Sequence, residues 1–320
     1  MPETLAASGA EVEAAEAEST TTVVVAFFAN LLIAVSKTVV AVFSGSASMV
    51  AESAHSWADT GNQVLLLVAD RRSRHPADEQ HPYGYGREAY VWSMLAALGL
   101  FTAGAVVSVW NGVSALLREE AETSYLWAWI VLGIAFVFEG TSFLQAFRQT
   151  RREARHLDVE LFEHALNTSD PTLRAVFAED AAALSGIVIA AFGIGLSQLT
   201  GSPVFDAVGS IAVGLLLGVV AIVLINQNRR YLTGMESNER LRKAAIDKVK
   251  SMPQVDKVSY LRLEYVGPRQ VLLMTRVDFA GDDPEPDVAR SLRKLEKALE
   301  EDPNITEAVI TLSTPDEPGL

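Results

Sequence analysis

The sequence predicts an α-helical membrane protein, with six transmembrane helices followed by a small cytoplasmic α+β domain. Apolar residues make up 49% of the 320 residues and the mean hydropathy is +0.21, which is too apolar for a soluble chain with a polar surface. Six apolar runs are long enough to cross a bilayer, which takes roughly 20 residues. After Leu232 the sequence changes to a mixed charged and apolar pattern, which is typical of a folded domain outside the membrane.

Charge and cysteine content exclude several kinds of function. The 40 acidic residues outnumber the 26 basic ones and give a net charge of −14. Nucleic acid is therefore not expected as a partner, because its phosphates require a basic face. The chain has no cysteine, which excludes disulfides, thiolate catalysis and cysteine-based zinc or iron–sulfur sites. Any metal must bind to His, Asp, Glu or backbone oxygen atoms.

Residues 1–22 are predicted to form a disordered acidic tail. They contain five glutamates and no lysine or arginine, in a background of Ala, Ser and Thr without apolar periodicity. A secretory signal would need a basic segment before its apolar stretch. The sequence of this tail does not indicate any chemical role for it.

The transmembrane region is expected to span residues 23–232. Its apolar runs are 23–43, 47–69, 89–117, 125–147, 174–197 and 204–226, and each should be helical because the bilayer core offers no water to backbone polar groups. Arginines gather in the connections after the second and fourth runs, namely Arg71, Arg72, Arg74, Arg87, Arg148, Arg151, Arg152 and Arg155. Because basic loops stay cytoplasmic, both termini should be cytoplasmic. We expect an integral multi-pass protein, in the plasma membrane of a bacterium.

Residues 233–313 are expected to form the cytoplasmic domain, followed by a short tail over 314–320. Helical spacing covers 239–251 and 287–300, and strand patterns cover 255–266, 269–279 and 305–312. The order αββαβ suits a ferredoxin-like layer of two helices on a three-stranded sheet. Since about 80 residues make a small core, packing against a second copy is expected.

Ionisable side chains inside the second run indicate a cation site. Each costs at least ~2.5 kcal/mol at membrane depth, so such residues mark function by default. Glu52, His55, Ser56, Asp59 and Gln63 follow one another at helical spacings and share one face. His55 and Asp59 are one turn apart, a spacing at which an imidazole and a carboxylate can bind the same ion.

The fifth run adds a second acidic pair, Glu179 and Asp180. Neighbouring residues on a helix diverge by about 100°, so we expect one of the two to be a ligand and the other its neighbour. Glu139 in the fourth run and Asp206 in the sixth are lesser candidates for proton coupling or for supporting the ligands.

Structural alternatives compete with these roles. Glu52 and Asp206 could cap helix N-termini, Lys37 could pair with an acid, and Glu139 could form a hydrogen bond between helices. The remaining histidines, His75, His81, His156 and His164, are expected to be solvated. Ser56 beside His55 is the one hint of a hydrolase, and consecutive helical residues diverge too far to form such a pair.

Three motifs resemble the cation diffusion facilitator family. They are SGSASMVAESAHSWAD across the first two runs, HPYGYGRE before the third, and PVFDAVGSIAVGLLLG entering the sixth. The segments HPYGYGREAYVW and SDPTLRAVFAEDAAALSG are most similar to the zinc transporter nine branch of that family.

The resemblance implies a transport site built from an (H/D)xxxD motif and an HxxxD motif. The first corresponds to His55 and Asp59, whereas Glu179 stands where the family has His and Ala183 where it has Asp. Asp180 could compensate for this departure. Neutral His55 with ionised Asp59 and Glu179 totals −2, which balances a divalent cation.

The resemblance further implies a homodimeric exporter that exchanges a cytoplasmic divalent cation, zinc first, for protons. Manganese, cobalt or iron(II) is an alternative cargo, and a metal-binding regulatory or scaffold membrane protein is an alternative function. We expect no permanent cofactor, no nucleic acid and no enzymatic activity, with membrane lipid around the helices.

Overall fold

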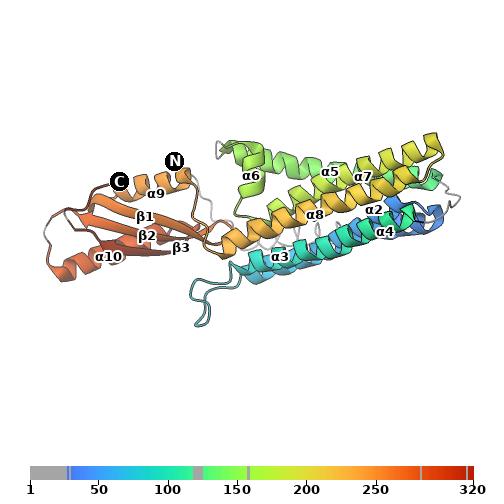
Figure 1. Ribbon diagram of the computed structural model, residues 1–320. Coiled ribbons are helices and arrows are strands. Elements are labelled where there is room, and N and C mark those ends of the chain that lie inside the picture. The colour runs from blue at the N-terminus through green and yellow to red at the C-terminus, as the bar shows by residue number, and fades with distance from the viewer. Residues whose placement is uncertain (1–26, 29, 118–124, 157–158, 282, 315) are drawn as a thin grey trace. The chain divides into compact units, whose positions relative to one another are not determined.

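The computed structural model describes residues 27–28, 30–117, 125–156, 159–281, 283–314 and 316–320 (Figure 1). The predicted acidic tail, 1–22, lies outside these residues. The chain forms two compact units. A helical unit contains the described parts of Met1–Val64, Ala96–Gln149 and Val176–Ile222, and a second unit contains Leu65–Leu95, Thr150–Ala175 and Val223–Leu320.

Four helices in the described residues are long and apolar enough to cross a membrane. They are α3 to α4 (Glu88–Leu116), α5 (Leu126–His156), α7 (Pro171–Thr200) and α8 (Val204–Leu232). They correspond to the last four predicted runs, so the chain is a helical membrane protein. The second run forms α2 (Ala47–Ser73), whose polar residues lower its hydropathy, and the first forms the shorter apolar helix Asn30–Ser44.

The third run is not one regular α-helix. It consists of α3 (Glu88–Leu100), a π-helical turn η1 (Phe101–Val106) and α4 (Val107–Leu116). Such turns occur mostly as single insertions in α-helices, frequently at functional sites. Here α8 packs closely beside it, since Gly112 faces the Ala207 carbonyl and Gly214 faces the Ala105 carbonyl. Neither glycine leaves room for a side chain, which is typical of helix contacts in membranes.

Two apolar clusters hold the helical unit together. One is made by helix 30–44, α2, α5 and α7, and its larger members are Ile33, Met49, Leu132, Ile187 and Ile194. The other joins α2, η1, α7 and α8 through Ala51, Ala58, Ala105, Ala182, Val213 and Leu217. Both clusters include α2, which therefore lies among the more apolar helices.

A short helix that the sequence did not predict, α6 (Leu161–Asn167), precedes α7 in the second unit. The fully buried Arg174 fixes the link between α6 and α7, because its guanidinium donates to the Thr168 carbonyl at 2.8 Å and to Asn228 Oδ1 at 2.5 Å. It also lies over the ring of Tyr231, 5.1 Å from the centroid, and Tyr231 stacks on Tyr90. This network joins the ends of α3, α7 and α8.

The C-terminal region has the expected order of elements, αββαβ. These are α9 (Glu239–Lys250), β1 (Val255–Gly267), β2 (Gln270–Phe279), α10 (Glu285–Glu300) and β3 (Ile305–Leu312). The sheet order is β1-β2-β3, with β1 antiparallel and β3 parallel to β2. Both helices and the sheet contribute to one core, with Val249, Leu261, Leu273, Leu295 and Leu299 at its centre.

The residues predicted as a terminal tail run back along β1. Leu320 N donates to the Val258 carbonyl at 2.8 Å, and Ser259 Oγ donates to Glu317 Oε2 at 2.8 Å. Lys257 Nζ donates to the Glu317 carbonyl, also at 2.8 Å. The tail thus covers part of an edge strand, where unpaired backbone groups could otherwise recruit another chain.

The hairpin between β1 and β2 contacts the loop that follows α2. Gly86 packs directly against Gly267 and the Val266 carbonyl, and Arg87 forms an ion pair with Glu264 at 2.8 Å. A methyl group at Gly86 would meet backbone atoms at 2.7 Å, so the contact requires glycine there.

We predict that Gly86→Ala separates this loop from the hairpin. Overpacking against backbone costs about 1–3 kcal/mol, and each 1.4 kcal/mol is tenfold in an equilibrium. Amide hydrogen exchange in the segment 264–270 should therefore become about tenfold faster. Gly99→Ala is the matched control, because nothing lies within 4 Å of a Cβ at that position. Equal exchange in the two variants would contradict the prediction.

Candidate metal centre

The predicted polar face exists on α2. His55 Nε2 lies 3.4 Å from Asp59 Oδ2, one helical turn away, and the two side chains are 1% and 15% exposed. Glu52 is fully buried three residues before His55. The spacing of three and four residues places all three on one side of the helix. An imidazole nitrogen and a carboxylate oxygen are thus held near one another inside the protein.

Buried polar atoms without a hydrogen-bond partner concentrate on this stretch of α2. Within the described part of the chain they include both ring nitrogens of His55 and one oxygen each of Glu52, Ser56, Asp59, Asn62 and Gln63. Buried polar groups in folded proteins are nearly always hydrogen-bonded, so each exception needs an explanation. A set of nitrogen and oxygen donors in this state suits a cation or the water that accompanies it.

The two acids of α7 turn toward different helices. Glu179 is buried and its Oε1 accepts a hydrogen bond from Asn62 Nδ2 of α2. Asp180 is half-buried, and its Oδ2 accepts a hydrogen bond from Ser142 Oγ of α5 at 2.8 Å. The divergence expected of neighbouring helical residues therefore brings Glu179 to the α2 face and Asp180 to α5.

The four predicted ligands do not converge as a complete set. No three His, Asp or Glu side chains among the described residues lie close enough to hold one ion. The structure supplies two halves instead, the His55–Asp59 pair and Glu179, and their assignment as ligands stays a prediction. Ala183, which stands where the resembling family has Asp, is buried and offers no donor.

Asn62 of α2, which contacts Glu179, was not among the predicted site residues. Its side chain is 2% exposed and contacts Glu179. Its position seven residues after His55, almost two helical turns, is the signal that could have identified it.

Lys37 pairs with Glu52, as one of the structural alternatives predicted. The two side chains are both 0% exposed and Lys37 Nζ lies 2.9 Å from Glu52 Oε2. The other carboxylate oxygen of Glu52, Oε1, lies 2.7 Å from the position that a Cβ at Gly186 would take. This close approach of α7 therefore requires glycine at that position. Beside this pair, Thr38 Oγ1 and Ser53 Oγ share a hydrogen bond of 2.7 Å. Helix 30–44 and α2 therefore meet along a polar seam.

Asp206 caps a helix, although not its own. Its carboxylate accepts hydrogen bonds from Ala47 N at 2.6 Å, Ser48 N at 3.2 Å and Ser46 Oγ at 2.9 Å, all at the start of α2. A carboxylate at a helix N-terminus satisfies free amide groups and interacts favourably with the helix dipole. Glu139, the other lesser candidate, lies half-buried on α5.

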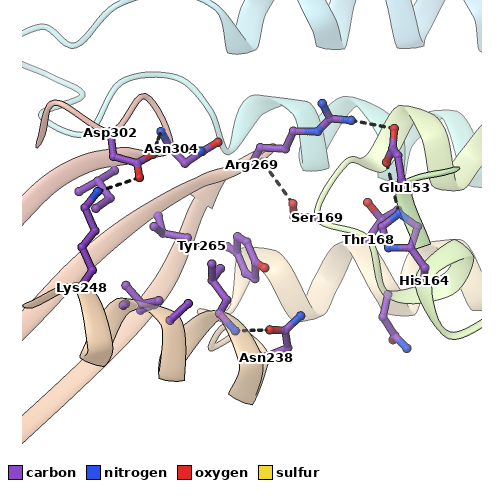
Figure 2. A pocket seen from close by; sticks show the side chains of 17 residues that line it. Glu153, His164, Thr168, Ser169, Asn238, Lys248, Tyr265, Arg269, Asp302 and Asn304 are labelled. Carbon is purple, nitrogen blue, oxygen red and sulfur yellow. Dashed lines mark hydrogen bonds and ion pairs between the residues drawn. The ribbon is translucent and has the colours of Figure 1, made fainter. Parts of the chain in front are cut away.

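One histidine departs from the solvated role that the sequence predicted. His164 of α6 is 9% exposed, and its Nε2 lies 3.2 Å from Glu153 Oε2. The other oxygen of Glu153 accepts from Arg269 at 3.1 Å, and Arg269 N donates to Ser169 Oγ (Figure 2). Because α6 was not predicted, the burial of His164 was not expected.

These residues border a cavity of about 520 Å³ in the second unit (Figure 2). Lys248 and Asp302 line the cavity at its other end, and their side chains pair at 3.0 Å (Figure 2). Burial would raise the pKa of Asp302, but the hydrogen bonds from Lys248 and Asn304 outweigh it and hold the pKa below its ordinary value. Burial raises the pKa of Tyr265, which lines the cavity between these ends. The charged groups of the cavity are thus paired with one another.

The transmembrane region matches a known protein family. Residues 23–233 match the family described as the cation efflux transmembrane domain. This range covers every side chain of the candidate metal centre.

Curated relatives extend the match. The chain is 35% identical over 240 residues to the proton-coupled zinc antiporter SLC30A9, mitochondrial, of Xenopus laevis, which covers 75% of this chain and 43% of the relative. The human protein of that name is 34% identical over 240 residues, covering 75% and 42%. Metal tolerance protein C4 of Arabidopsis thaliana is 35% identical over 238 residues, covering 74% and 52%. The chain thus spans about half the length of the curated relatives it matches.

The Lys37–Glu52 pair gives a test of the helical packing. Removing one partner of a buried ion pair leaves an uncompensated charge and costs about 3–5 kcal/mol, whereas replacing both with apolar residues is often neutral. We predict that Lys37→Met lowers the melting temperature of the detergent-purified protein strongly, and that Lys37→Met combined with Glu52→Met restores most of the loss. Lys243→Met, at an exposed position of α9, should have little effect. A double variant as unstable as the single one would show that the two side chains do not depend on each other.

Proposed function

The chain belongs to the cation efflux family, and from this premise we propose that it exports a divalent metal cation, zinc first, from the cytoplasm in exchange for protons. The observation that carries the proposal is the set of buried nitrogen and oxygen atoms on α2 that have no hydrogen-bond partner, together with the contact that Asn62 of the same helix makes with Glu179 of α7. Burying such polar atoms among apolar helices costs free energy unless a ligand or a water binds to them. The named activities of the relatives, zinc antiport and metal tolerance, support the same class of cargo.

In the proposed site His55, Asp59 and Glu179 bind the metal, and Asp180 supports them or holds a proton. Neutral His55 with two ionised carboxylates totals −2, so the loaded site carries no net charge among the helices. Ligands must be deprotonated to bind a metal, so protons and metal compete for the same atoms. Protons that enter from the outer side would displace the metal, and cytoplasmic metal would displace the protons.

The proposal includes a topology. Helix 30–44 and α2 would cross the membrane with the four apolar helices, which makes six spans, and the αββαβ region would form a ferredoxin-like domain over 233–313. Arginine-rich connections after α2 and within the end of α5 favour cytoplasmic termini. A homodimer and a bacterial plasma membrane remain part of the proposal, although the animal relatives are named as mitochondrial.

A second candidate is a regulatory or scaffold membrane protein that binds metal without moving it. The absence of a third converging acid or histidine in the described ranges favours it. Both functions predict that the protein binds metal, but only the first predicts that metal crosses the membrane. A parent protein that binds zinc but moves none would support this second candidate.

We predict that purified protein in vesicles with an acidic lumen takes up zinc, as reported by a zinc-sensitive dye inside. His55→Ala and Asp59→Ala should each reduce the uptake to the level of empty vesicles, because each removes a ligand. Glu179→Ala should abolish flux while weak metal binding persists. A protonophore should abolish uptake by the parent, because the proton gradient drives it.

Matched controls are His75→Ala and Asp70→Ala, which change the same residue types away from the site. His75 is exposed, and Asp70 forms an exposed ion pair with Arg74. Both controls should transport as the parent does. Transport by His55→Ala or Asp59→Ala at the parental rate would overturn the proposed site.

A further inference from the structure

The amide of Asn62 stands between the two halves of the proposed metal site. Its Nδ2 donates a hydrogen bond to Glu179, and its Oδ1 is buried without a hydrogen-bond partner among the described residues. The side chain is 2% exposed. A buried, unpaired amide oxygen costs free energy until a ligand or a water satisfies it.

Asn62 projects from α2 in nearly the same direction as His55. At about 100° per residue the two positions differ by about 20°, whereas Gln63, the next amide, differs from His55 by about 80°. Asn62 is also three residues from Asp59, a spacing at which helical side chains are neighbours. Its amide is therefore the one on α2 best placed to act together with His55, Asp59 and Glu179.

An amide oxygen adds a ligand without adding charge. Ionised Asp59 and Glu179 already balance a divalent cation, and a third carboxylate would leave an uncompensated negative charge among apolar helices. Asn62 raises the number of donors from three to four and keeps the total at −2. It thereby supplies the donor that Ala183 cannot, from another helix.

We propose that Asn62 is a ligand and a specificity-determining residue of the metal site. Its Oδ1 binds the cation while its Nδ2 orients Glu179, and the inference rests on the proposed transport function. The resulting set has one nitrogen donor, from His55, and three oxygen donors. Oxygen donors suit manganese better than imidazole does, so this site accepts Mn²⁺ beside Zn²⁺.

The test compares Zn²⁺ and Mn²⁺ uptake by the reconstituted full chain and its Asn62 variants. Asn62→Ala should raise KM for both metals about 10–100-fold, the range found when groups around a metal site are removed. Asn62→His should exchange the amide oxygen for an imidazole nitrogen and raise the ratio of Zn²⁺ to Mn²⁺ transport about tenfold or more. A purely structural role for Asn62 would change uptake of both metals equally and leave the ratio unchanged.

Two further variants separate this role from general effects of losing an amide. Asn111→Ala is the control, because it removes an amide that donates to the Ala47 carbonyl, away from the acids of α2, and it should keep the parental ratio. Gln63→Ala removes the rival amide and should change the ratio less than Asn62→His does. A shifted ratio in Gln63→Ala with none in the Asn62 variants would overturn the inference, as would parental KM and ratio in Asn62→Ala and Asn62→His.

Equilibrium binding to the detergent-purified proteins keeps the inference separate from the proposed function. If the parent moves neither metal, transport is wrong as a function, and binding of Zn²⁺ and Mn²⁺ then decides the role of Asn62. Weaker binding of both metals to Asn62→Ala, at an unchanged melting temperature without metal, supports the ligand role. Parental binding by Asn62→Ala overturns it. If Asn62→Ala does not fold, Asn62→His decides. A higher ratio of Zn²⁺ to Mn²⁺ binding than in the parent supports the ligand role, and the parental ratio overturns it.

Discussion

The helical unit depends on one constraint, which is that the ionisable side chains of α2 need polar partners inside a group of apolar helices. Charged groups facing lipid are costly, and α5, α7 and α8 instead expose large apolar side chains such as Phe136, Phe192 and Val219. On α2 the residues Ala51, His55 and Ala58 are buried. The outer helices can therefore meet lipid while α2 keeps its polar face turned to protein.

This constraint sorts the acids of the membrane region into different roles. Glu52 is neutralised by Lys37, and Asp206 is satisfied by the first amide groups of α2. Asp180 is bound by Ser142 of α5. The acids that remain on the α2 side are Asp59 and Glu179, whose combined charge when ionised is that of one divalent cation with the opposite sign. The neutral Lys37–Glu52 pair also means that a cation bound nearby meets no excess positive charge from helix 30–44.

In the second unit, the tip of the β1–β2 hairpin is shaped by its contacts. Arg269 is the one described residue other than glycine with a positive φ, 59°, a conformation that is uncommon for a residue with a side chain. Its backbone N donates to Ser169 and its guanidinium to Glu153, so both its backbone and its side chain are hydrogen-bonded. These bonds offset the backbone cost, and they explain why an arginine occupies a turn position that usually favours glycine.

The sequence predicted the elements well and the contacts between them only in part. Apolar runs and strand patterns located the four long helices and all five elements of the C-terminal region, because burial and periodicity are local properties of the chain. The spacing of His55 and Asp59 likewise revealed their shared face. The cap that Asp206 provides to α2, the burial of His164 and the contact of Asn62 with Glu179 were not predictable in the same way, since each depends on a partner distant in sequence.

Glu179 and Asp180 show which part of the candidate site could not be predicted from the sequence. Two adjacent helical residues must diverge by about 100°, and that much follows from the sequence. Which of them turns toward α2 depends on how α7 is rotated about its own axis, and small-residue contacts set that rotation. Gly186 admits the Glu52 carboxylate, and Gly193 lies against the Phe205 carbonyl of α8. With α7 held in this orientation, Glu179 reaches Asn62 and Asp180 reaches Ser142. The glycines of α7 therefore decide which of the two acids turns toward α2, and with it which acid can take part in the proposed site.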